Sequence, residues 1–317
     1  MTTSSIKTKT GQLFSRLFAG AVKLMSLLPL RVLHVLARMG AFLMAHVIRY
    51  RRKVVTGNLR RAFPEKNERE IRKIALDFYK HLADVTVETI RLLHIPEKTF
   101  LGRCQISDDG MQLLQPYIQE QRSFIGLLGH FGNWEWVPPV VSLNMPGHRV
   151  IPAYRPLKDK VFDGLMLKIR GRYAYDLVPK KVVGRAMVRY IRDGQPFIMG
   201  LISDQTPAPK TAYWTSFLSQ DTPVFTGPEK LARSTNMPVV FVALRRRSRG
   251  HYLLHVELIT NTPAELKEGE ISRRFMSLLE KEIRRSPGDW LWSHRRWKHK
   301  RPQPDNEKPG EGEQHGS

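Results

Sequence analysis

The stretch that decides the fold is FIGLLGHFGNWEW, residues 124–136. Its apolar start, Phe124 to Leu128, is short and bounded by polar residues, which predicts a fully buried strand of an α/β sheet. Further strand candidates follow at Arg149 to Ala153, Phe197 to Ile202, Val239 to Leu244 and Tyr252 to Leu258. Helical stretches lie between them, near Val161 to Arg170 and Val182 to Arg192. This alternation predicts an α/β fold with a mixed, largely parallel central sheet flanked by helices.

Helical periodicity and turn signals extend this prediction outward. Glu68 to Leu93 carries apolar residues at helical spacing, which predicts one long helix with a core-facing side. Ser272 to Arg285 is amphipathic in the same way, and Arg245 to Gly250 is typical of a hairpin loop between the last two strands. Thr226-Gly227-Pro228-Glu229 has the spacing of a capping box for the helix that follows. The alternative for that helix start is an anion site.

Behind the first strand, the chain places a histidine and a carboxylate five positions apart. His130 would emerge at the carboxyl end of the strand, where open α/β sheets bind their ligands. Gly129 and Gly132 permit a sharp turn and a close approach of the backbone to a substrate. Glu135 can accept a proton from one imidazole nitrogen and leave the other free to take a proton from a hydroxyl group. The alternative is a buried histidine that binds a backbone carbonyl, with Glu135 as a solvated acid at a helix start.

This His-x4-Glu motif, together with other blocks along the chain, resembles the bacterial lipid A late acyltransferases. These are the lauroyl and myristoyl transferases within the lysophospholipid acyltransferase superfamily. The resemblance covers most of the chain, and its other blocks are collinear with the family: NLRRAFP at 58–64, AYRP at 153–156, SDQ at 203–205 and WLWSHRRWK at 290–298. The chain departs from the family at Phe217-Leu218-Ser219, where many relatives carry a pair of phenylalanines followed by glycine. That departure leaves the acceptor open.

The resemblance implies an O-acyltransferase that moves an acyl chain from a thioester to a hydroxyl group of a lipid A precursor. His130 would remove the hydroxyl proton, Glu135 would hold the imidazole and stabilise its cation, and the oxygen would attack the thioester carbonyl directly. Backbone N–H groups near Gly132 and Asn133, with Arg155, would stabilise the oxyanion. Acyl carrier protein is the donor that the family implies, and acyl-CoA is the alternative. Because the motif activates any hydroxyl group, a lysophospholipid, aminolipid or glycolipid acceptor stays open.

Further residues are candidates for substrate binding or support. Arg155 follows a strand between Tyr154 and Pro156, a setting that preorganises its guanidinium for a phosphate or carboxylate, and Lys158 is a weaker helper. Asp204 ends a buried strand where a functional loop is expected. The resemblance gives Asp204 a role in orienting the acceptor or shaping the site. The alternatives are a surface arginine of a basic protein and an aspartate that caps its loop.

Composition narrows the partners. The chain of 317 residues has 52 Lys+Arg against 29 Asp+Glu and a net charge of +23, so it attracts nucleic acid, an anionic membrane face or an acidic protein. It carries no RNA-recognition block, zinc-finger spacing or helix-turn-helix pattern, so no nucleic acid partner is expected. The expected partners are acyl carrier protein, an anionic membrane surface and a lipid A precursor. The lone Cys104 matches no metal spacing, and we expect neither a metal nor a cofactor beyond the thioester co-substrate.

The amino-terminal segment predicts attachment to a membrane. Residues Leu13 to Ile48 are mostly apolar, but charges interrupt them and Pro29 breaks or kinks the helix. At about 100° per residue the basic side chains fall on one side; they are Arg16, Lys23, Arg31, His34 and Arg38. Such a helix either lies in the membrane interface or turns its cations to the protein and its apolar side to lipid. Spanning and in-plane arrangements both stay open.

We therefore expect a membrane-associated segment over residues 1–50, an acyltransferase α/β domain over 51–301 and a disordered tail over 302–317. Trp290 to Arg301 interleaves tryptophans with cations, which favours contact with a membrane or glycolipid over base stacking, with core packing of some tryptophans as the alternative. The combined hypothesis is an enzyme at the cytoplasmic face of the bacterial inner membrane. Its rival is a basic membrane-binding or nucleic-acid-binding protein without catalysis.

Overall fold

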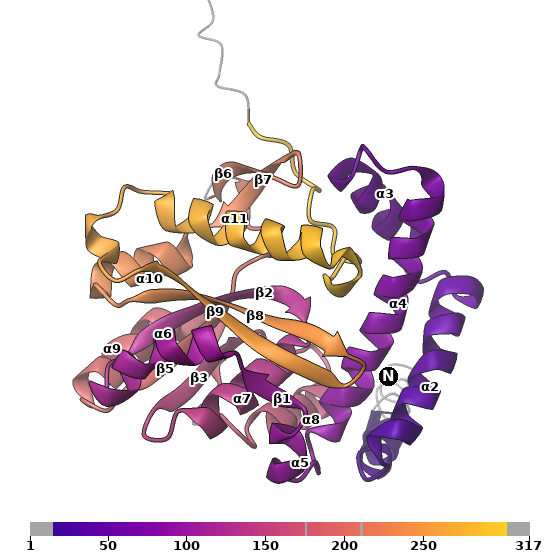
Figure 1. The fold of residues 1–317 in the computed structure, drawn as a ribbon, viewed down its shortest axis with the longest axis horizontal. Coiled ribbons are helices and arrows are strands. Elements are labelled where there is room, and N and C mark those ends of the chain that lie inside the picture. The colour runs from indigo at the N-terminus through magenta and orange to yellow at the C-terminus, as the bar shows by residue number, and fades with distance from the viewer. Residues whose placement is uncertain (1–14, 175, 210–211, 303–317) are drawn as a thin grey trace, which may run out of the picture.

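A computed structural model describes residues 15–174, 176–209 and 212–302 of the chain. At its centre is a seven-stranded sheet in the order β1-β9-β8-β2-β5-β3-β4. Strands β8 and β9 pair antiparallel, and the other neighbouring pairs are parallel. The strands of this sheet are β1 (Cys104–Ile106), β2 (Phe124–Gly132), β3 (Arg149–Tyr154), β4 (Val178–Pro179), β5 (Phe197–Ile202), β8 (Val239–Ser248) and β9 (His251–Thr260). The predicted mixed, largely parallel sheet flanked by helices is confirmed (Figure 1).

Apolar side chains fill both faces of this sheet. Ile125 and Leu127 of β2 belong to the core shared with α11 (Glu270–Arg285). Phe124 and Leu128, on the opposite side of the same strand, pack in the core shared with α6 (Asp108–Gln119) and α7 (Val137–Asn144). Because both faces are covered there, β2, β5 and the first part of β8 form continuous apolar runs, whereas β9 alternates between buried and half-buried residues. The helices are α2 (Leu30–Phe42), α3 (Arg52–Ala62), α4 (Glu68–Arg91), α5 (Glu97–Leu101), α6 (Asp108–Gln119), α7 (Val137–Asn144), α8 (Lys160–Arg170), α9 (Val183–Arg192), α10 (Gly227–Thr235) and α11 (Glu270–Arg285).

Of two capping-box sequences at helix starts, one forms the expected hydrogen bonds and the other does not. Asn67 begins α4 with a complete capping box, because its side chain accepts from the N–H of Glu70 while the Glu70 carboxylate accepts from the N–H of Asn67. The capping box expected at Thr226 is wrong. Glu229 is buried and turns away from its own helix, accepting from the N–H of Gly269 at 2.6 Å and from the N–H of Ser272 at 3.1 Å. Glu229 therefore caps α11 instead of α10.

The amino-terminal part of the structure packs along α4. Residues 15–25 are helical, Pro29 precedes α2 as predicted for a break, and π-helical Leu43–Val47 continues α2. Leu30–Val47 is the one stretch in the described part of the chain that is long and apolar enough to cross a membrane. Leu30 and Leu33 are buried against the protein, whereas most of its other large apolar side chains are exposed; the exposed ones are Val32, Val35, Leu36, Met39, Phe42, Leu43 and Val47.

His34 departs from the predicted row of cations. Arg31 and Arg38 are exposed, as a row of solvated cations requires, but His34 is buried on the side of α2 that faces the protein. A neutral or paired imidazole tolerates burial far better than a guanidinium does, so His34 can serve as a contact to α4. Helix α2 thus has one side that packs on the protein and includes His34, exposed arginines at positions 31 and 38, and an outer side of exposed apolar residues.

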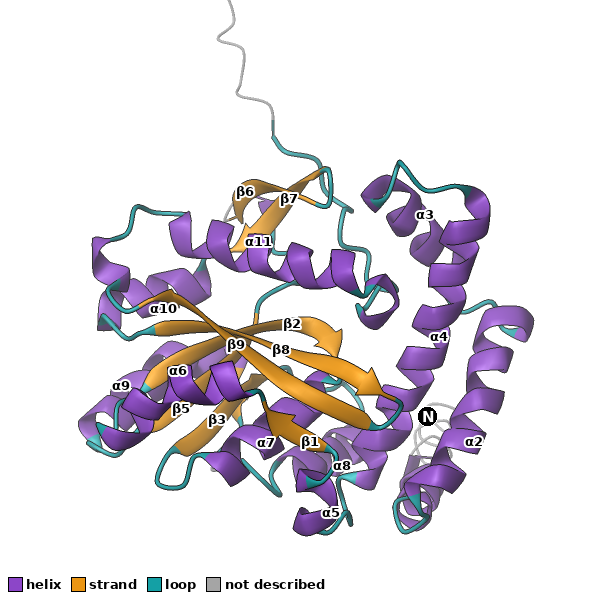
Figure 2. Ribbon diagram, in the orientation of Figure 1, coloured by secondary structure: helices purple, strands orange, loops and turns teal. Residues whose placement is uncertain are grey.

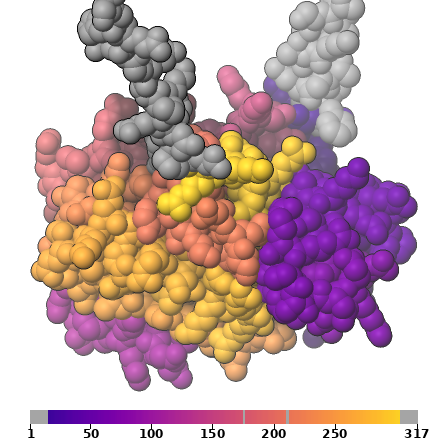
Figure 3. All heavy atoms as spheres, turned by 90° about the horizontal axis from the view of Figure 1, so that it is seen from above, coloured from indigo at the N-terminus to yellow at the C-terminus, as the bar shows by residue number. Residues whose placement is uncertain are grey.

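The tryptophans of the closing block (residues 290–298) belong to the core, which favours the core-packing alternative over their interpretation as a membrane contact. Trp290 and Trp292 are buried and meet edge to face with ring centroids 4.7 Å apart, and Arg296 is fully buried. The Asn58 amide on α3 donates to the backbone oxygens of Trp292 and His294, each at 2.9 Å. Figure 3 shows α3 and the start of α4, in purple, beside this yellow carboxyl-terminal segment. The tail predicted to be disordered lies, beyond Pro302, outside the described residues.

The departure from the family at Phe217-Leu218-Ser219 lies in a separate hairpin. Strands β6 (Ala212–Phe217) and β7 (Gln220–Phe225) pair antiparallel outside the main sheet (Figure 2). Leu218 and Ser219, the two turn residues, have φ angles of 49° and 60°. Positive φ at both positions is the pattern of a type I′ turn, which favours glycine or asparagine. The departure therefore changes the chemistry of a turn next to α11.

Candidate active site

A cavity of about 640 Å³ lies against the sheet face that α6 and α7 cover. Alternate residues of β2 line it, from Phe124 through Gly126 and Leu128 to His130, so they belong to one face of the sheet. At about 3.3 Å per residue, these positions span roughly 20 Å along the strand. Most charged and polar residues of the lining lie at or just beyond the carboxyl ends of the parallel strands, and Arg170, at the end of α8, joins them by binding Glu135. The charged and polar lining residues are His130, Glu135, Tyr154, Arg155, Arg170, Lys180, Lys181, Ser203 and Gln205. The cavity is an apolar chamber with a polar end.

Paired glycines keep the middle of the chamber open. Gly126 of β2 and Gly200 of β5 lie opposite each other in the parallel ladder, and both line the cavity. A Cβ built on Gly126 would lie 3.6 Å from Val242, and one on Gly200 would lie 3.6 Å from Pro152. Both distances are ordinary contacts, so no backbone strain requires glycine there. Because these two glycines have no side chains, they leave the middle of the cavity empty.

His130 is bound by Asp204. Nδ1 of His130 lies 2.6 Å from Oδ1 of Asp204, and the backbone N–H of His130 donates to Oδ2 at 2.9 Å. The Trp290 indole N–H donates to the same Oδ2 at 2.8 Å. With its proton on Nδ1, the imidazole presents the Nε2 lone pair toward Gln205, whose amide nitrogen is 3.3 Å away. The structure therefore gives Asp204 the orienting contact that the sequence predicted for Glu135.

The contact between His130 and Asp204 shifts the pKa of both side chains. Burial acts to lower the pKa of His130, but the negative charge of Asp204 and its hydrogen bond outweigh burial and raise this pKa above its ordinary value. Burial acts to raise the pKa of Asp204, yet the charge of His130 and the hydrogen bonds from His130 and Trp290 lower it to about 2. Asp204 is therefore ionised at neutral pH and stabilises an imidazolium.

Glu135 binds Arg170, which corrects the contact expected with His130. The Arg170 guanidinium reaches both carboxylate oxygens of Glu135, with Nε–Oε2 at 2.9 Å and Nη2–Oε1 at 2.6 Å. The physical reason is local geometry: Glu135 lies in the one-turn helix Trp134–Trp136, and the end of α8 brings Arg170 beside it. A bidentate pair of this kind fixes both side chains, and both line the polar end of the cavity.

Gly132 and Asn133 follow His130 in the motif segment (residues 129–136) and contact neighbouring elements of the fold. Gly132 has a φ of 58°, and a Cβ there would fall 1.7 Å from the backbone oxygen of Leu244, so only glycine fits. The close approach predicted for Gly132 is thus to strand β8. Asn133 is fully buried, and its side-chain amide donates to Glu88 on α4 at 2.7 Å. Its side chain supports the loop, while its backbone N–H stays a candidate for the oxyanion.

The two cations predicted beyond β3 have different positions. Arg155 is exposed and lines the polar end of the cavity, in line with its expected place near the site. Lys158 is exposed on the loop that follows, outside the described lining of the cavity. Lys180 and Lys181, which the sequence analysis did not select, contribute further positive charge to the lining. Negatively charged groups of a ligand would be attracted to this end of the cavity.

Two further residues of the site, Arg170 and Trp290, were not predicted from the sequence. Arg170 had one signal, its position at the end of a predicted helix, but nothing in the sequence pairs it with Glu135. Trp290 had a stronger signal, because it opens the closing block that resembles the family. In the described part of the chain, no group of three or more His, Cys, Asp or Glu side chains is arranged to hold a metal ion.

The profile of the bacterial lipid A biosynthesis acyltransferase family matches residues 3–299. A lipid A biosynthesis lauroyltransferase of Escherichia coli (strain K12) is 25% identical over 285 residues, which cover 88% of this chain and 89% of that protein. A lipid A biosynthesis acyltransferase of Haemophilus influenzae is 25% identical over 78% of each chain. A lipid A biosynthesis palmitoleoyltransferase of E. coli (strain K12) is 24% identical over 79% of this chain and 80% of that protein.

The profile match covers the amino-terminal helices, the motif segment and the closing block in one collinear alignment. It confirms the resemblance that the sequence blocks predicted. The chain therefore belongs to the bacterial lipid A biosynthesis acyltransferases, a family of O-acyltransferases.

Proposed function

We propose that the protein transfers a fatty acyl chain from an acyl carrier protein thioester to a hydroxyl group of a lipid A precursor, at the cytoplasmic face of the bacterial inner membrane. One observation carries this proposal: the hydrogen-bonded pair of His130 and Asp204 stands at the polar end of a long apolar chamber. A fatty acyl chain fits such a chamber, and its carbonyl group would lie at the polar end beside the imidazole.

His130 is the general base in this mechanism. Because Nδ1 donates to Asp204, Nε2 takes the proton of the acceptor hydroxyl as its oxygen bonds to the thioester carbonyl carbon. The tetrahedral oxyanion then collapses, the carbon–sulfur bond breaks, and the leaving thiolate takes the proton from the imidazolium. The products are an ester and a thiol. Asp204 holds the imidazole in this tautomer and stabilises its cation between the two proton transfers.

Glu135 acts through Arg170. Fixed by two hydrogen bonds, the Arg170 guanidinium is a preorganised positive charge at the polar end of the chamber. It would stabilise the oxyanion or an anionic group of the substrate, together with Arg155 and the backbone N–H groups of Gly132 and Asn133. In this proposal Glu135 is a positioning residue, and His130 is the catalytic residue that touches the reacting atoms.

The surfaces around the site favour an anionic acceptor and a membrane location. Arg155, Lys180 and Lys181 place positive charge at the polar end of the chamber, where the phosphates of a lipid A precursor or an acidic carrier protein would bind. The apolar outer side of α2 exposes Met39 and Phe42 by 61% and 60%, which suits burial in a bilayer. A soluble acceptor would not explain the exposed apolar side of α2.

The test uses purified protein with acyl carrier protein thioesters and acyl-CoA thioesters of several chain lengths. Each donor is offered with a lipid A precursor, a lysophospholipid and an aminolipid in mixed micelles, and the products are weighed by mass spectrometry. The expected product is the lipid A precursor plus one acyl group, made from the carrier protein donor and absent with folded His130→Ala. Near-normal turnover by His130→Ala would overturn the mechanism, and acylation of another lipid alone would overturn the acceptor.

A further inference from the structure

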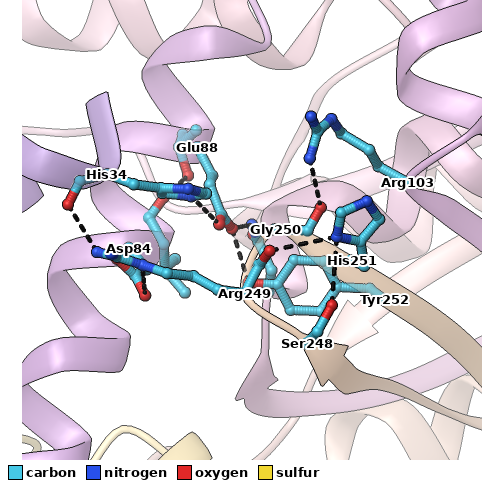
Figure 4. A network of polar contacts seen from close by, with 12 residues as sticks. His34, Asp84, Glu88, Arg103, Ser248, Arg249, Gly250, His251 and Tyr252 are labelled. Atoms are coloured by element: carbon cyan, nitrogen blue, oxygen red, sulfur yellow. Dashed lines mark hydrogen bonds and ion pairs between the residues drawn. The ribbon is translucent and has the colours of Figure 1, made fainter. Parts of the chain in front are cut away.

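One buried carboxylate joins the amino-terminal helix to the motif segment. Glu88 of α4 is fully buried, and its Oε1 lies 2.8 Å from Nε2 of His34 on α2. Its other oxygen accepts from the Asn133 amide and from the Tyr252 hydroxyl, each at 2.7 Å. Figure 4 shows His34, Glu88 and Tyr252 meeting from three different elements. The carboxylate of Glu88 is thus shared by α2, β9 and the segment that carries His130.

The position of His34 is specified by more than apolar contact. Arg249 binds both oxygens of Asp84 and donates from Nη2 to the backbone oxygen of His34 at 2.7 Å (Figure 4). Gly250 has a φ of 70°, and a Cβ there would lie 2.8 Å from Cε1 of His34. The β8–β9 turn therefore leaves room for the imidazole. The main chain and the side chain of His34 are both bound.

The motif segment depends on α4 for its support. His81 Nε2 lies 3.0 Å from the backbone oxygen of Gly132, and the Trp136 indole donates to the backbone oxygen of Glu88 at 3.2 Å. Asn133 follows Gly132 directly, so its bond to Glu88 is a third attachment to the same helix. Burying a carboxylate is costly unless its oxygens are paired. Loss of His34 leaves Oε1 without its partner, and a shift of Glu88 would pass directly to Asn133.

Tyr252 is suited to remain a donor in this cluster. Burial raises the pKa of the Tyr252 hydroxyl well above its ordinary value, and the neighbouring Glu88 charge raises it further. The hydroxyl therefore keeps its proton and the carboxylate keeps that partner. Of the three partners of Glu88, His34 is the one supplied by a helix whose opposite side exposes large apolar residues.

We propose that helix α2, besides attaching the protein to a membrane, helps to position the active-site segment that carries His130. His34, acting through Glu88, is a positioning residue for the motif segment. When α2 leaves its place on α4, Glu88 loses a partner and the segment that carries His130 loses its productive arrangement. The kinetic part of the test rests on the proposed acyl transfer, whereas the exchange part does not.

The test separates membrane attachment from positioning. His34→Leu keeps the helix apolar but removes the partner of Glu88, whereas His34→Gln retains an amide that can donate to Oε1. His46→Leu makes the same change at an exposed site on the π-helical continuation of α2 and is the matched control. We expect all variants to bind phosphatidylglycerol-containing vesicles like the wild type. For His34→Leu, kcat should fall by about tenfold with KM changed less than about twofold. His34→Gln should recover most of kcat, and His46→Leu should match the wild type.

Amide hydrogen exchange of a peptide spanning residues 128–137 provides a readout that needs no substrate. Exchange should be faster in His34→Leu and unchanged in His34→Gln and His46→Leu. Wild-type kcat in His34→Leu, or unchanged exchange of this peptide, would overturn the inference. Faster exchange in a protein whose wild type transfers no acyl group would support the coupling and count against the proposed function. If His34→Leu does not fold, Tyr252→Phe is the substitute variant, because it removes one hydrogen-bond donor to the same Glu88 carboxylate. Unchanged exchange of the 128–137 peptide in Tyr252→Phe would overturn the role of Glu88.

Discussion

Oδ1 of Asp204 lies 2.6 Å from Nδ1 of His130, although 74 positions separate the two residues in the chain. Strands β2 and β5 are parallel neighbours, with Leu128 opposite Ile202, so His130 and Asp204, each two residues beyond that pair, meet. Glu135, only five positions from His130, instead binds Arg170 from α8. The partner of the imidazole is thus determined by the order of strands in the sheet.

Asp204→Asn should lower kcat by on the order of 10³-fold, because the imidazole loses both its orientation and the charge that stabilises its cation. The rising limb of the pH–rate profile reports the pKa of His130, which Asp204 raises, so this limb should move to lower pH in the variant. Steady-state acyl transfer across pH checks both. The control is Asp193→Asn, which removes an exposed carboxylate near Arg149. An unshifted pH profile would contradict the assigned role.

The same pair makes folding stability depend on pH. His130 has a raised pKa when folded, so its contribution is complete below the unfolded value of about 6.5 and is lost as pH rises through the folded value. Asp204 has a lowered pKa, so its contribution is present above 3.8 and is lost as pH falls toward about 2. The free energy of unfolding should therefore differ most between wild type and Asp204→Asn from about pH 4 to 6.5. Denaturant unfolding at several pH values measures this difference, and a constant difference would contradict it.

Glu135→Gln and Arg170→Met should each lower acyl transfer, and the double variant should be little worse than either. The reason is that the two side chains form one bidentate unit, so removing the second partner takes away little more. Glu68→Gln is the control, because it breaks an exposed pair with Arg60, and neither residue lines the cavity. Initial rates of the three variants form a double-mutant cycle. Independent, additive losses would show that Glu135 acts without Arg170.

Gly126→Ala should shift the preferred donor toward shorter acyl chains. The added methyl makes an ordinary contact 3.6 Å from Val242 and fills space in the middle of the chamber without straining the fold. Gly164→Ala on α8 adds the same methyl where nothing lies within 4 Å and is the matched control. The product ratio from an equimolar mixture of donors measures the shift. An unchanged ratio would place the acyl chain elsewhere.

Ser219→Gly should stabilise the protein by about 0.5 kcal/mol, because relief of the left-handed backbone exceeds the entropy that glycine adds to the unfolded chain. Ser219 has a φ of 60° in the β6–β7 turn. Ser216→Gly, in the preceding strand, should destabilise by a similar amount and is the control. Urea unfolding midpoints at constant m-value give both changes. Destabilisation by Ser219→Gly would mean that its hydroxyl contributes more than the strain costs.

The sequence predicted the elements better than the contacts between them. Strand β5 and helices α8 and α9 fall within a residue of expectation, because continuous apolar runs and 3.6-residue periodicity depend on nearby residues alone. The partner of His130 could not be predicted, because it lies on a strand whose neighbour is known only once the sheet order is known. Glu229 failed as a cap for a similar reason, since α11 offers it better donors from far along the chain.

Amphipathic patterns left a second ambiguity. A row of tryptophans and cations has the same composition whether it faces a bilayer or packs in a core, and Trp290 and Trp292 pack in the core. His34 shows the converse, because its place among exposed arginines concealed a bond to a buried carboxylate. Only the packing of α2 on α4 resolves which basic side chain turns inward.

The chamber opened by Gly126 and Gly200 also has a thermodynamic meaning. Space in a protein interior lacks dispersion contacts, so the chamber lowers the stability of the folded protein when nothing fills it. A chain that fills the space returns those contacts and stabilises the folded state by mass action. Under the proposed function, the supply of substrate and the stability of the fold are therefore linked: the folded enzyme should be most stable when donors of the fitting length are abundant, and least stable when they are scarce.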